Sequence, residues 1–121
     1  MEDKILVEKL AHALFDKKAE QIIALDLRGL SMVSDYMILA NGNVGRHVQA
    51  LSVFLEKLLK EEKRLLCIEG KHISDWIVLD AGTIMIHLFT KELRDKYRLE
   101  SLWKQAKIIP ITFKETGDRH G

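Results

Sequence analysis

The stretch that decides the fold reads Trp76-Ile77-Val78-Leu79-Asp80-Ala81-Gly82-Thr83-Ile84-Met85-Ile86-His87-Leu88-Phe89. Two β-rich runs flank a small-residue turn, which predicts a hairpin around Ala81-Gly82. Because successive strand residues point to opposite faces, each run divides into two sets of alternate positions. We call each set a parity. One parity is wholly aliphatic. The other mixes bulky, polar and ionisable groups that a packed core accepts poorly, so we interpret it as a face that meets a partner. This mixed parity consists of Trp76, Val78, Asp80, Thr83, Met85, His87 and Phe89.

Length and composition favour one compact domain. The chain has 121 residues, 47% of them hydrophobic, and one proline. We expect a single domain over residues 1–113 and a polar, flexible tail over 114–121. The net charge of +1 gives no bulk attraction to nucleic acid. The first residues lack the features of a signal peptide, and no apolar run approaches the roughly 20 residues of a membrane helix. These features predict a cytoplasmic protein with no membrane contact.

The remaining pattern predicts helices and strands around this hairpin. The expected elements are a helix over 2–17, strands over 22–27 and 36–40, a long helix after the turn 41–45, a strand over 65–68 and a helical turn over 91–97. Asn43 is the expected N-cap of the long helix. This order predicts an α/β fold with a mixed five-stranded sheet covered by helices. The strands on either side of the long helix are expected to pair in parallel.

Two groups of residues allow a chemical interpretation beside a structural one. Arg46 and His47 follow the glycine turn, where a helix N-terminus could hold an anion, although an ordinary cap is favoured. His87 could act as a general base oriented by Asp80, as in a hydrolase or transferase, but no nucleophile has a supporting sequence context. Cys67, the single cysteine, lies in an apolar run and is expected to be a small buried residue. The histidine spacing predicts no metal site, and no motif predicts a cofactor.

The order and spacing of several short motifs resemble the ribosomal silencing factor (Iojap-like) family. The resemblance spans roughly residues 5–105. It rests on Ser34-Asp35-Tyr36-Met37-Ile38-Leu39-Ala40, Gly42, Arg46-His47-Val48, Glu69-Gly70, Trp76-Ile77-Val78-Leu79-Asp80, Gly82, Ile86-His87-Leu88-Phe89, Arg94, Tyr97, Leu99-Glu100 and Leu102-Trp103. Val44 and Thr83 depart from the family's usual residues, which are a small hydroxyl residue and an acidic residue respectively.

The resemblance implies a nucleotidyltransferase-like fold without catalytic carboxylates and a protein that is not an enzyme. The strand after the long helix offers Cys67 and Glu69 instead of the paired carboxylates that would hold Mg²⁺. The resemblance further implies binding to the large ribosomal subunit through ribosomal protein L-fourteen, with at most minor contact with ribosomal RNA. Such binding would block joining of the small subunit and repress translation.

On this interpretation the mixed face is the docking surface. Lys91 and Arg94 are placed at its rim. An alternative use of the same face is homodimerisation, in which it pairs with its own copy away from the ribosome. The predicted partner-binding residues are Trp76, Asp80, Met85, His87, Lys91, Arg94 and Tyr97.

Overall fold

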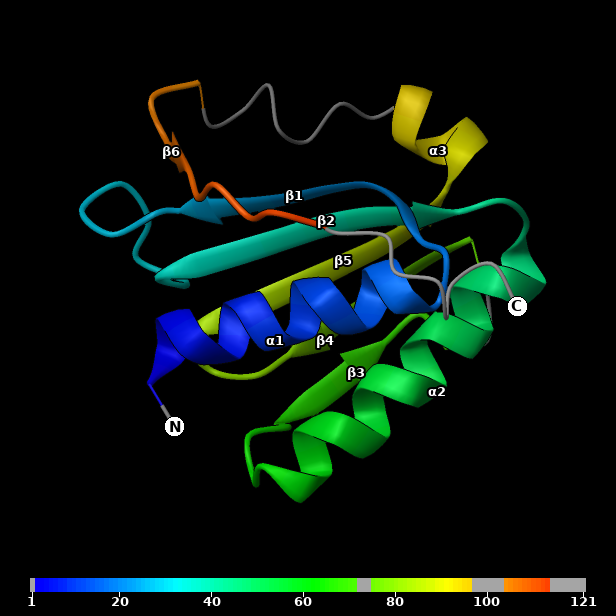
Figure 1. The fold of residues 1–121 in the computed structure, drawn as a ribbon, viewed down its shortest axis with the longest axis horizontal. Coiled ribbons are helices and arrows are strands. Elements are labelled where there is room, and N and C mark those ends of the chain that lie inside the picture. Colours follow the sequence, from blue (N-terminus) through cyan, green and yellow to red (C-terminus); the bar gives the residue numbers. More distant parts are fainter. Residues whose placement is uncertain (1, 72–74, 97–103, 114–121) are drawn as a thin grey trace.

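The computed structural model describes residues 2–71, 75–96 and 104–113. Three helices and six strands are assigned within these ranges (Figure 1). In chain order they are α1 (Asp3–Asp16), β1 (Glu20–Asp26), β2 (Tyr36–Gly42), α2 (Gly45–Glu61), β3 (Cys67–Glu69), β4 (Trp76–Asp80), β5 (Ile84–Thr90), α3 (Lys91–Lys96) and β6 (Lys107–Ile108). Tyr97, Trp103 and the predicted tail over 114–121 lie outside the described residues.

The strands form one mixed sheet in the order β3-β4-β5-β2-β1-β6. β2 and β5 pair in parallel, and the other neighbours pair antiparallel. The predicted mixed α/β architecture is therefore confirmed. The sheet has six strands where five were expected, because β6 is two residues long and too short to produce a periodic signal.

One predicted strand pairing is wrong. The strand before α2 is β2, and it pairs in parallel with β5 rather than with β3, the strand that follows α2. β3 is three residues long and pairs with β4 at the edge of the sheet. The fully buried β2 needs an apolar neighbour on each side, and β5 supplies Ile84, Ile86 and Leu88. A short, largely exposed strand such as β3 suits an edge position instead.

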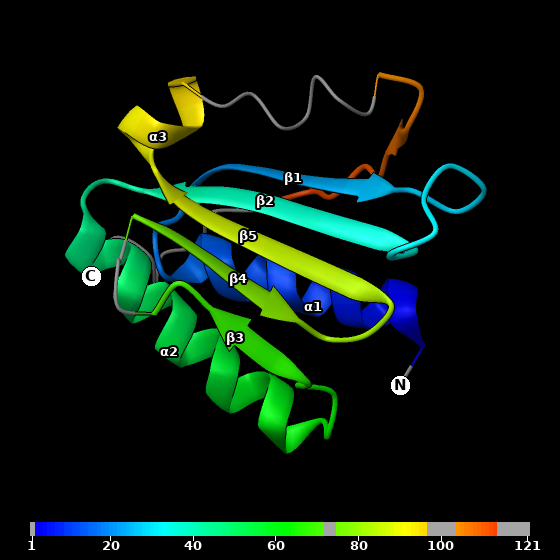
Figure 2. The same ribbon diagram turned by 180° about the vertical axis from the view of Figure 1, so that it is seen from behind.

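α1 and α2 cover the same face of the sheet, which leaves the opposite face turned away from both helices (Figures 1 and 2). The aliphatic parity of β4 and β5 points toward the helices, as predicted, and is completely buried. Burying a side chain of this size contributes about 1.5–3 kcal/mol relative to leaving it exposed, so this face is the main core. Its members include Leu6, Leu10, Leu14, Ile38, Leu51, Leu55, Leu59, Ile77, Leu79, Ile86 and Leu88.

The hairpin between β4 and β5 turns at Gly82, as expected. Gly82 has φ +83°, a left-handed conformation that favours glycine. The backbone N–H of Ala81 donates to the carbonyl oxygen of Ile84 at 2.9 Å. The backbone N–H of Gly82 donates to Oδ1 of Asp80 at 2.8 Å. Asp80 therefore stabilises the turn that aligns the two strands.

α2 begins differently from the prediction. Its N-cap is Val44 and not Asn43, and no side-chain hydrogen bond caps it. The backbone N–H of Asn43 donates to Nδ1 of His47 at 3.2 Å, and Nε2 of His47 lies 2.9 Å from the carbonyl oxygen of Lys17. Both ring nitrogens of His47 thus contact backbone atoms. This arrangement ties the start of α2 to the end of α1 and leaves His47 without a nitrogen for the anion considered above.

Candidate docking surface on the open sheet face

The mixed parity of β3, β4 and β5 forms a surface on the side of the sheet opposite α1 and α2 (Figure 2). Strand register arranges this surface in rows. One row runs from Cys67 through Asp80 to Met85, and the next runs from Glu69 through Val78 to His87. We call this surface the open face; its residues are Cys67, Glu69, Trp76, Val78, Asp80, Met85 and His87.

The mixed parity is not open along its whole length. Phe89 is completely buried in a second, smaller hydrophobic cluster. Leu93 of α3 packs against that cluster from the side away from α1 and α2. α3 starts immediately after β5, where Oγ1 of Thr90 accepts a hydrogen bond from the backbone N–H of Leu93 at 3.3 Å. The second cluster consists of Leu25, Leu27, Met37, Leu39 and Phe89.

Trp76 and His87 are joined by a hydrogen bond across the β4–β5 pair. Nε1 of Trp76 donates to Nδ1 of His87 at 3.2 Å. The His87 ring also stacks on Phe89, with centroids 6.0 Å apart and 14° between the planes. Trp76 itself tilts against Phe89 at 5.3 Å. Trp76 lies directly opposite Phe89 in the register, so His87 is its diagonal neighbour, a position that long and aromatic side chains can reach.

The environment of His87 does not suit a general base. Burial lowers the pKa of His87 to about 4, so the ring is neutral near pH 7. A neutral imidazole that accepts a hydrogen bond at Nδ1 carries its proton on Nε2. The nitrogen that could accept a proton is therefore already engaged by the Trp76 indole.

The proposed pairing of His87 with Asp80 is wrong. Register places Asp80 opposite Met85 and places His87 opposite Val78. Oδ1 of Asp80 accepts the Gly82 backbone N–H, and Nδ1 of His87 accepts the indole N–H. The geometry of the described residues therefore does not support the hydrolase or transferase hypothesis.

The structure separates the two residues predicted for the rim. Lys91 is exposed at the start of α3. Arg94 is only 3% exposed, so its placement at the rim is wrong. Nη1 of Arg94 lies 3.4 Å from Oδ1 of Asn41, and its guanidinium lies 6.0 Å from the centre of the Phe89 ring. Arg94 thus packs from α3 against Phe89 of the second cluster. Tyr97, the last predicted contact, lies outside the described residues.

Register adds three members to the open face that the sequence prediction did not select as contacts. Val78 shares the parity of Trp76, while Cys67 and Glu69 reach this face only because β3 pairs with β4. Cys67 is exposed, so the expectation of a buried thiol is wrong. The edge position of β3 explains the difference, because an edge strand has a neighbour on one side only.

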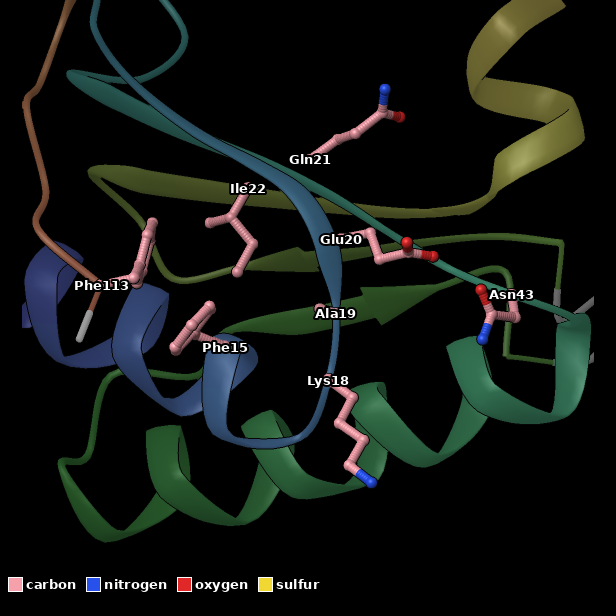
Figure 3. A pocket seen from close by; sticks show the side chains of 8 residues that line it. All are labelled: Phe15, Lys18, Ala19, Glu20, Gln21, Ile22, Asn43 and Phe113. Atoms are coloured by element: carbon pink, nitrogen blue, oxygen red, sulfur yellow. The ribbon is translucent and has the colours of Figure 1, made fainter. Parts of the chain in front are cut away.

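A hollow of about 640 Å³ lies elsewhere, at the junction of α1 and β1 (Figure 3). Phe15 and Phe113 lie side by side at one end, and Asn43 lies on the other side of β1 (Figure 3). The lining combines two aromatic rings with two amides, one amine and one carboxylate, and it has no serine, cysteine or histidine that could act as a nucleophile or base. The lining residues are Phe15, Lys18, Ala19, Glu20, Gln21, Ile22, Asn43 and Phe113.

Within residues 2–71, 75–96 and 104–113, no three His, Cys, Asp or Glu side chains lie close enough together to hold a metal ion. No helix in these ranges is both long enough and apolar enough to cross a membrane.

The fold and the open face together define a class of mixed α/β domain that has two helices on one side of its sheet. The model of the family described as "Ribosomal silencing factor during starvation" matches residues 1–120. The chain belongs to the ribosomal silencing factor family. It is therefore placed among ribosome-associated regulators of translation and not in a family of known enzymes.

Similar proteins agree with this assignment. The chain is 35% identical to ribosomal silencing factor RsfS of Halalkalibacterium halodurans, with 92% of this chain and 96% of that protein covered. It is 34% identical to the protein of the same name from Bacillus subtilis, with coverages of 93% and 97%. A mouse protein named "Mitochondrial assembly of ribosomal large subunit protein 1" is 32% identical, with 83% of this chain and 46% of that protein covered.

Solved structures show the same fold. A crystal structure of a protein from Bacillus halodurans matches with a TM-score of 0.79 at 32% identity, covering 90% of this chain and all of that chain. A crystal structure of a protein from Chromobacterium violaceum matches with a TM-score of 0.80, also at 32% identity, and both chains are covered completely.

Proposed function

We propose that this protein binds the large ribosomal subunit in the cytoplasm through ribosomal protein L-fourteen and sterically blocks joining of the small subunit. The observation that carries the proposal is the open face itself. It presents partly exposed Trp76, Val78, Met85 and His87 on a rigid pair of strands, on the side of the sheet that α1 and α2 leave uncovered. Tryptophan is among the residues that most often dominate binding energy at interfaces.

To block subunit joining, the protein needs only to bind the large subunit and to occupy space that the small subunit would otherwise take. A specific protein contact commonly covers roughly 800 Å² on each partner, which an open sheet face can supply. The small net charge of +1 favours a protein surface over a large area of ribosomal RNA, because proteins that bind RNA mainly by electrostatics are usually basic. Met85 and Trp76 mark the two ends of the proposed contact along the hairpin, and Lys91 adds an exposed charge beside it.

The first test is co-sedimentation of the purified protein with separated ribosomal subunits. Trp76→Ala should weaken binding to large subunits by about 30-fold, since truncation of a tryptophan that dominates an interface commonly costs roughly 2 kcal/mol or more. Val53→Ala is the matched control. Val53 is 55% exposed on α2, on the opposite side of the molecule, and its truncation should leave binding unchanged. Wild-type binding by a folded Trp76→Ala variant would exclude the open face as the contact.

Cys67 offers a second, independent test because it is the only cysteine in the chain and lies on the open face. Its alkylation by a maleimide can be followed by mass spectrometry of the peptide that contains it. Large subunits should slow this reaction, whereas small subunits should not. An unchanged rate in the presence of saturating large subunits would show that the contact does not extend to β3.

The blocking step requires its own measurement. Purified large and small subunits are mixed after preincubation with the protein, and formation of joined ribosomes is measured on sucrose gradients. The wild-type protein should reduce joining, and Trp76→Ala should not. If the wild-type protein binds large subunits and joining proceeds normally, the contact exists but the blocking mechanism is wrong.

Homodimerisation through the same face would compete with docking. Light scattering over a dilution series, with and without large subunits, distinguishes these uses. A dimer that dissociates on binding the subunit would be consistent with one shared face. A dimer that persists on the subunit would require two different faces.

A further inference from the structure

We infer that His87 is a positioning residue for docking, which holds the Trp76 indole in a fixed orientation through Nδ1 rather than acting mainly as a contact itself. This inference rests on the docking function proposed above. Its structural basis is a group of three rings on β4 and β5, Trp76, His87 and Phe89, arranged by the register of the hairpin.

The chain of contacts begins in the second cluster. Phe89 is completely buried there and cannot move without disturbing that cluster. The His87 ring stacks on Phe89 at 6.0 Å and 14°, which fixes the plane of the imidazole. With the ring in this plane, Nδ1 accepts the hydrogen bond of the indole Nε1 at 3.2 Å. A 180° turn of the ring would keep the plane but place a carbon atom there, so the hydrogen bond selects the observed orientation. The packing of Phe89 in the buried cluster therefore restrains the partly exposed Trp76 through His87.

The hydrogen bond also determines which part of Trp76 a partner meets. The indole N–H is its only donor and is directed at His87 within the chain. A partner would therefore contact mainly the carbon atoms of the ring. An indole already held in its binding orientation loses less conformational freedom on association, and such preorganisation increases affinity without any new contact.

Two substitutions distinguish the role of the Nδ1 acceptor of His87 from the role of its ring. In His87→Asn, Oδ1 stands close to the position of Nδ1, so the acceptor is kept while the ring that stacks on Phe89 is lost. In His87→Phe, the ring is kept while the acceptor is lost. Positioning through Nδ1 predicts that the Asn variant retains more affinity than the Phe variant. A role in packing alone predicts the reverse order.

The experiment measures binding of each variant to purified large subunits, with circular dichroism confirming that each is folded. His87→Phe should bind about three- to tenfold more weakly than wild type, the range expected for one net hydrogen bond. His87→Asn should lie measurably closer to wild type. Equal affinities, or weaker binding by the Asn variant, would overturn the inference.

A readout in the free protein tests the hydrogen bond without the ribosome. The indole N–H resonance of Trp76 is assigned in a ¹⁵N spectrum by its loss in Trp76→Phe. Its exchange with deuterium should be about three- to tenfold faster in His87→Phe than in wild type and slower in His87→Asn than in His87→Phe. Equal exchange rates in the two His87 variants would show that Nδ1 does not hold the indole and would overturn the inference.

The Trp76→Phe background supplies the matched control. Without the indole donor, His87→Asn loses the advantage of its acceptor, so its binding should no longer exceed that of His87→Phe. An advantage that persists would mean that the acceptor acts on another group. Failure of the proposed function is distinguishable, because the wild-type protein would then not bind large subunits at all. Failure of the present inference leaves wild-type binding intact and removes only the difference between variants.

Discussion

Arg94 and Asn41 are both buried, and Nη1 of Arg94 lies 3.4 Å from the side-chain oxygen of Asn41. Asn41 lies near the end of β2 and Arg94 lies in α3, so this contact joins the central strand to the short helix that covers the second cluster. The guanidinium also lies over the Phe89 ring. Arg94 therefore stabilises the fold beneath the open face.

Arg94→Ala should reduce the free energy of unfolding by about 2–3 kcal/mol, because it removes buried packing and leaves Oδ1 of Asn41 with one fewer donor. Urea denaturation measures the change. Lys91→Ala is the control on the same helix. Lys91 is exposed, and its truncation should change stability by less than about 0.5 kcal/mol. An Arg94→Ala variant as stable as Lys91→Ala would show that the contact is not structural.

Arg64 contacts the start of α1 and the turn between β4 and β5. Its Nη2 donates to Oδ1 of Asp3 at 2.5 Å and lies 3.2 Å from Oγ1 of Thr83. The hydrogen bond from Arg64 lowers the pKa of Asp3 below its ordinary value of 3.8. Arg64→Ala should therefore lower the free energy of unfolding by about 1 kcal/mol at pH 7, since the pair is partly screened by solvent.

The Arg64–Asp3 pair also has a defined pH dependence. A carboxyl group with a lowered folded-state pKa stabilises the protein above its unfolded pKa, and this contribution is lost as the pH falls through the folded value. The stability difference between wild type and Asp3→Asn should be full above about pH 5 and should shrink toward zero at lower pH. Urea titrations at several pH values measure it. A difference that is constant down to pH 2.5 would contradict the assignment.

Much of the fold could be predicted because the spacing of hydrophobic residues indicates which side chains are buried. The alternation in β4 and β5 anticipated which residues face α1 and α2, and the burial pattern agrees at each aliphatic position. Whether the residues on the other face of these strands are buried depends on packing that the alternation does not indicate. Phe89 and His87 have the same parity, yet Phe89 is completely buried because α3 lies next to it, while His87 keeps partial exposure.

The errors concern which partner each polar side chain finds in the fold, near in the sequence or far from it. Arg94 carries a charge and was expected at the rim, but the fold pairs it with Asn41, 53 positions earlier. Asp80 and His87 have spacing compatible with a catalytic pair, but turn geometry assigns Asp80 to Gly82. Asn43 is a good cap by residue type, but α2 begins one residue later, so the N-cap is Val44. Residue type alone does not determine these partners, of which only the Arg94–Asn41 contact joins distant parts of the sequence.

Gly70 is a point where the backbone leaves no space for a side chain. It has φ +87°, and a Cβ at this position would overlap the carbonyl oxygen of Trp76. Gly29 has nearly the same φ, +83°, but a Cβ there would meet nothing within 4 Å. The two glycines therefore separate the cost of a left-handed backbone from the cost of a steric clash.

Gly29→Ala should lower the free energy of unfolding by about 1 kcal/mol, the conformational term alone. Gly70→Ala should cost at least about 2 kcal/mol more, because the start of β4 must move. If the open face binds the large subunit, Gly70→Ala should also weaken that binding, since Trp76 moves with the strand. Urea denaturation and co-sedimentation measure the two effects. Equal stability of the two variants would contradict the close approach of Gly70 to Trp76.

The lowered pKa of His87 predicts how stability depends on pH. In the unfolded chain its pKa is near 6.5, whereas burial lowers the folded value to about 4. Below pH 6.5 the unfolded chain therefore binds a proton that the folded protein resists. Stability should fall as the pH decreases from 6.5 to 4, by up to about 3 kcal/mol.

His87→Phe removes this titrating group, so its loss of stability over the same range should be smaller than that of wild type. Urea denaturation of both proteins at pH 7 and pH 4.5 measures the difference. Parallel behaviour would mean that His87 is not buried as a neutral ring in the folded protein.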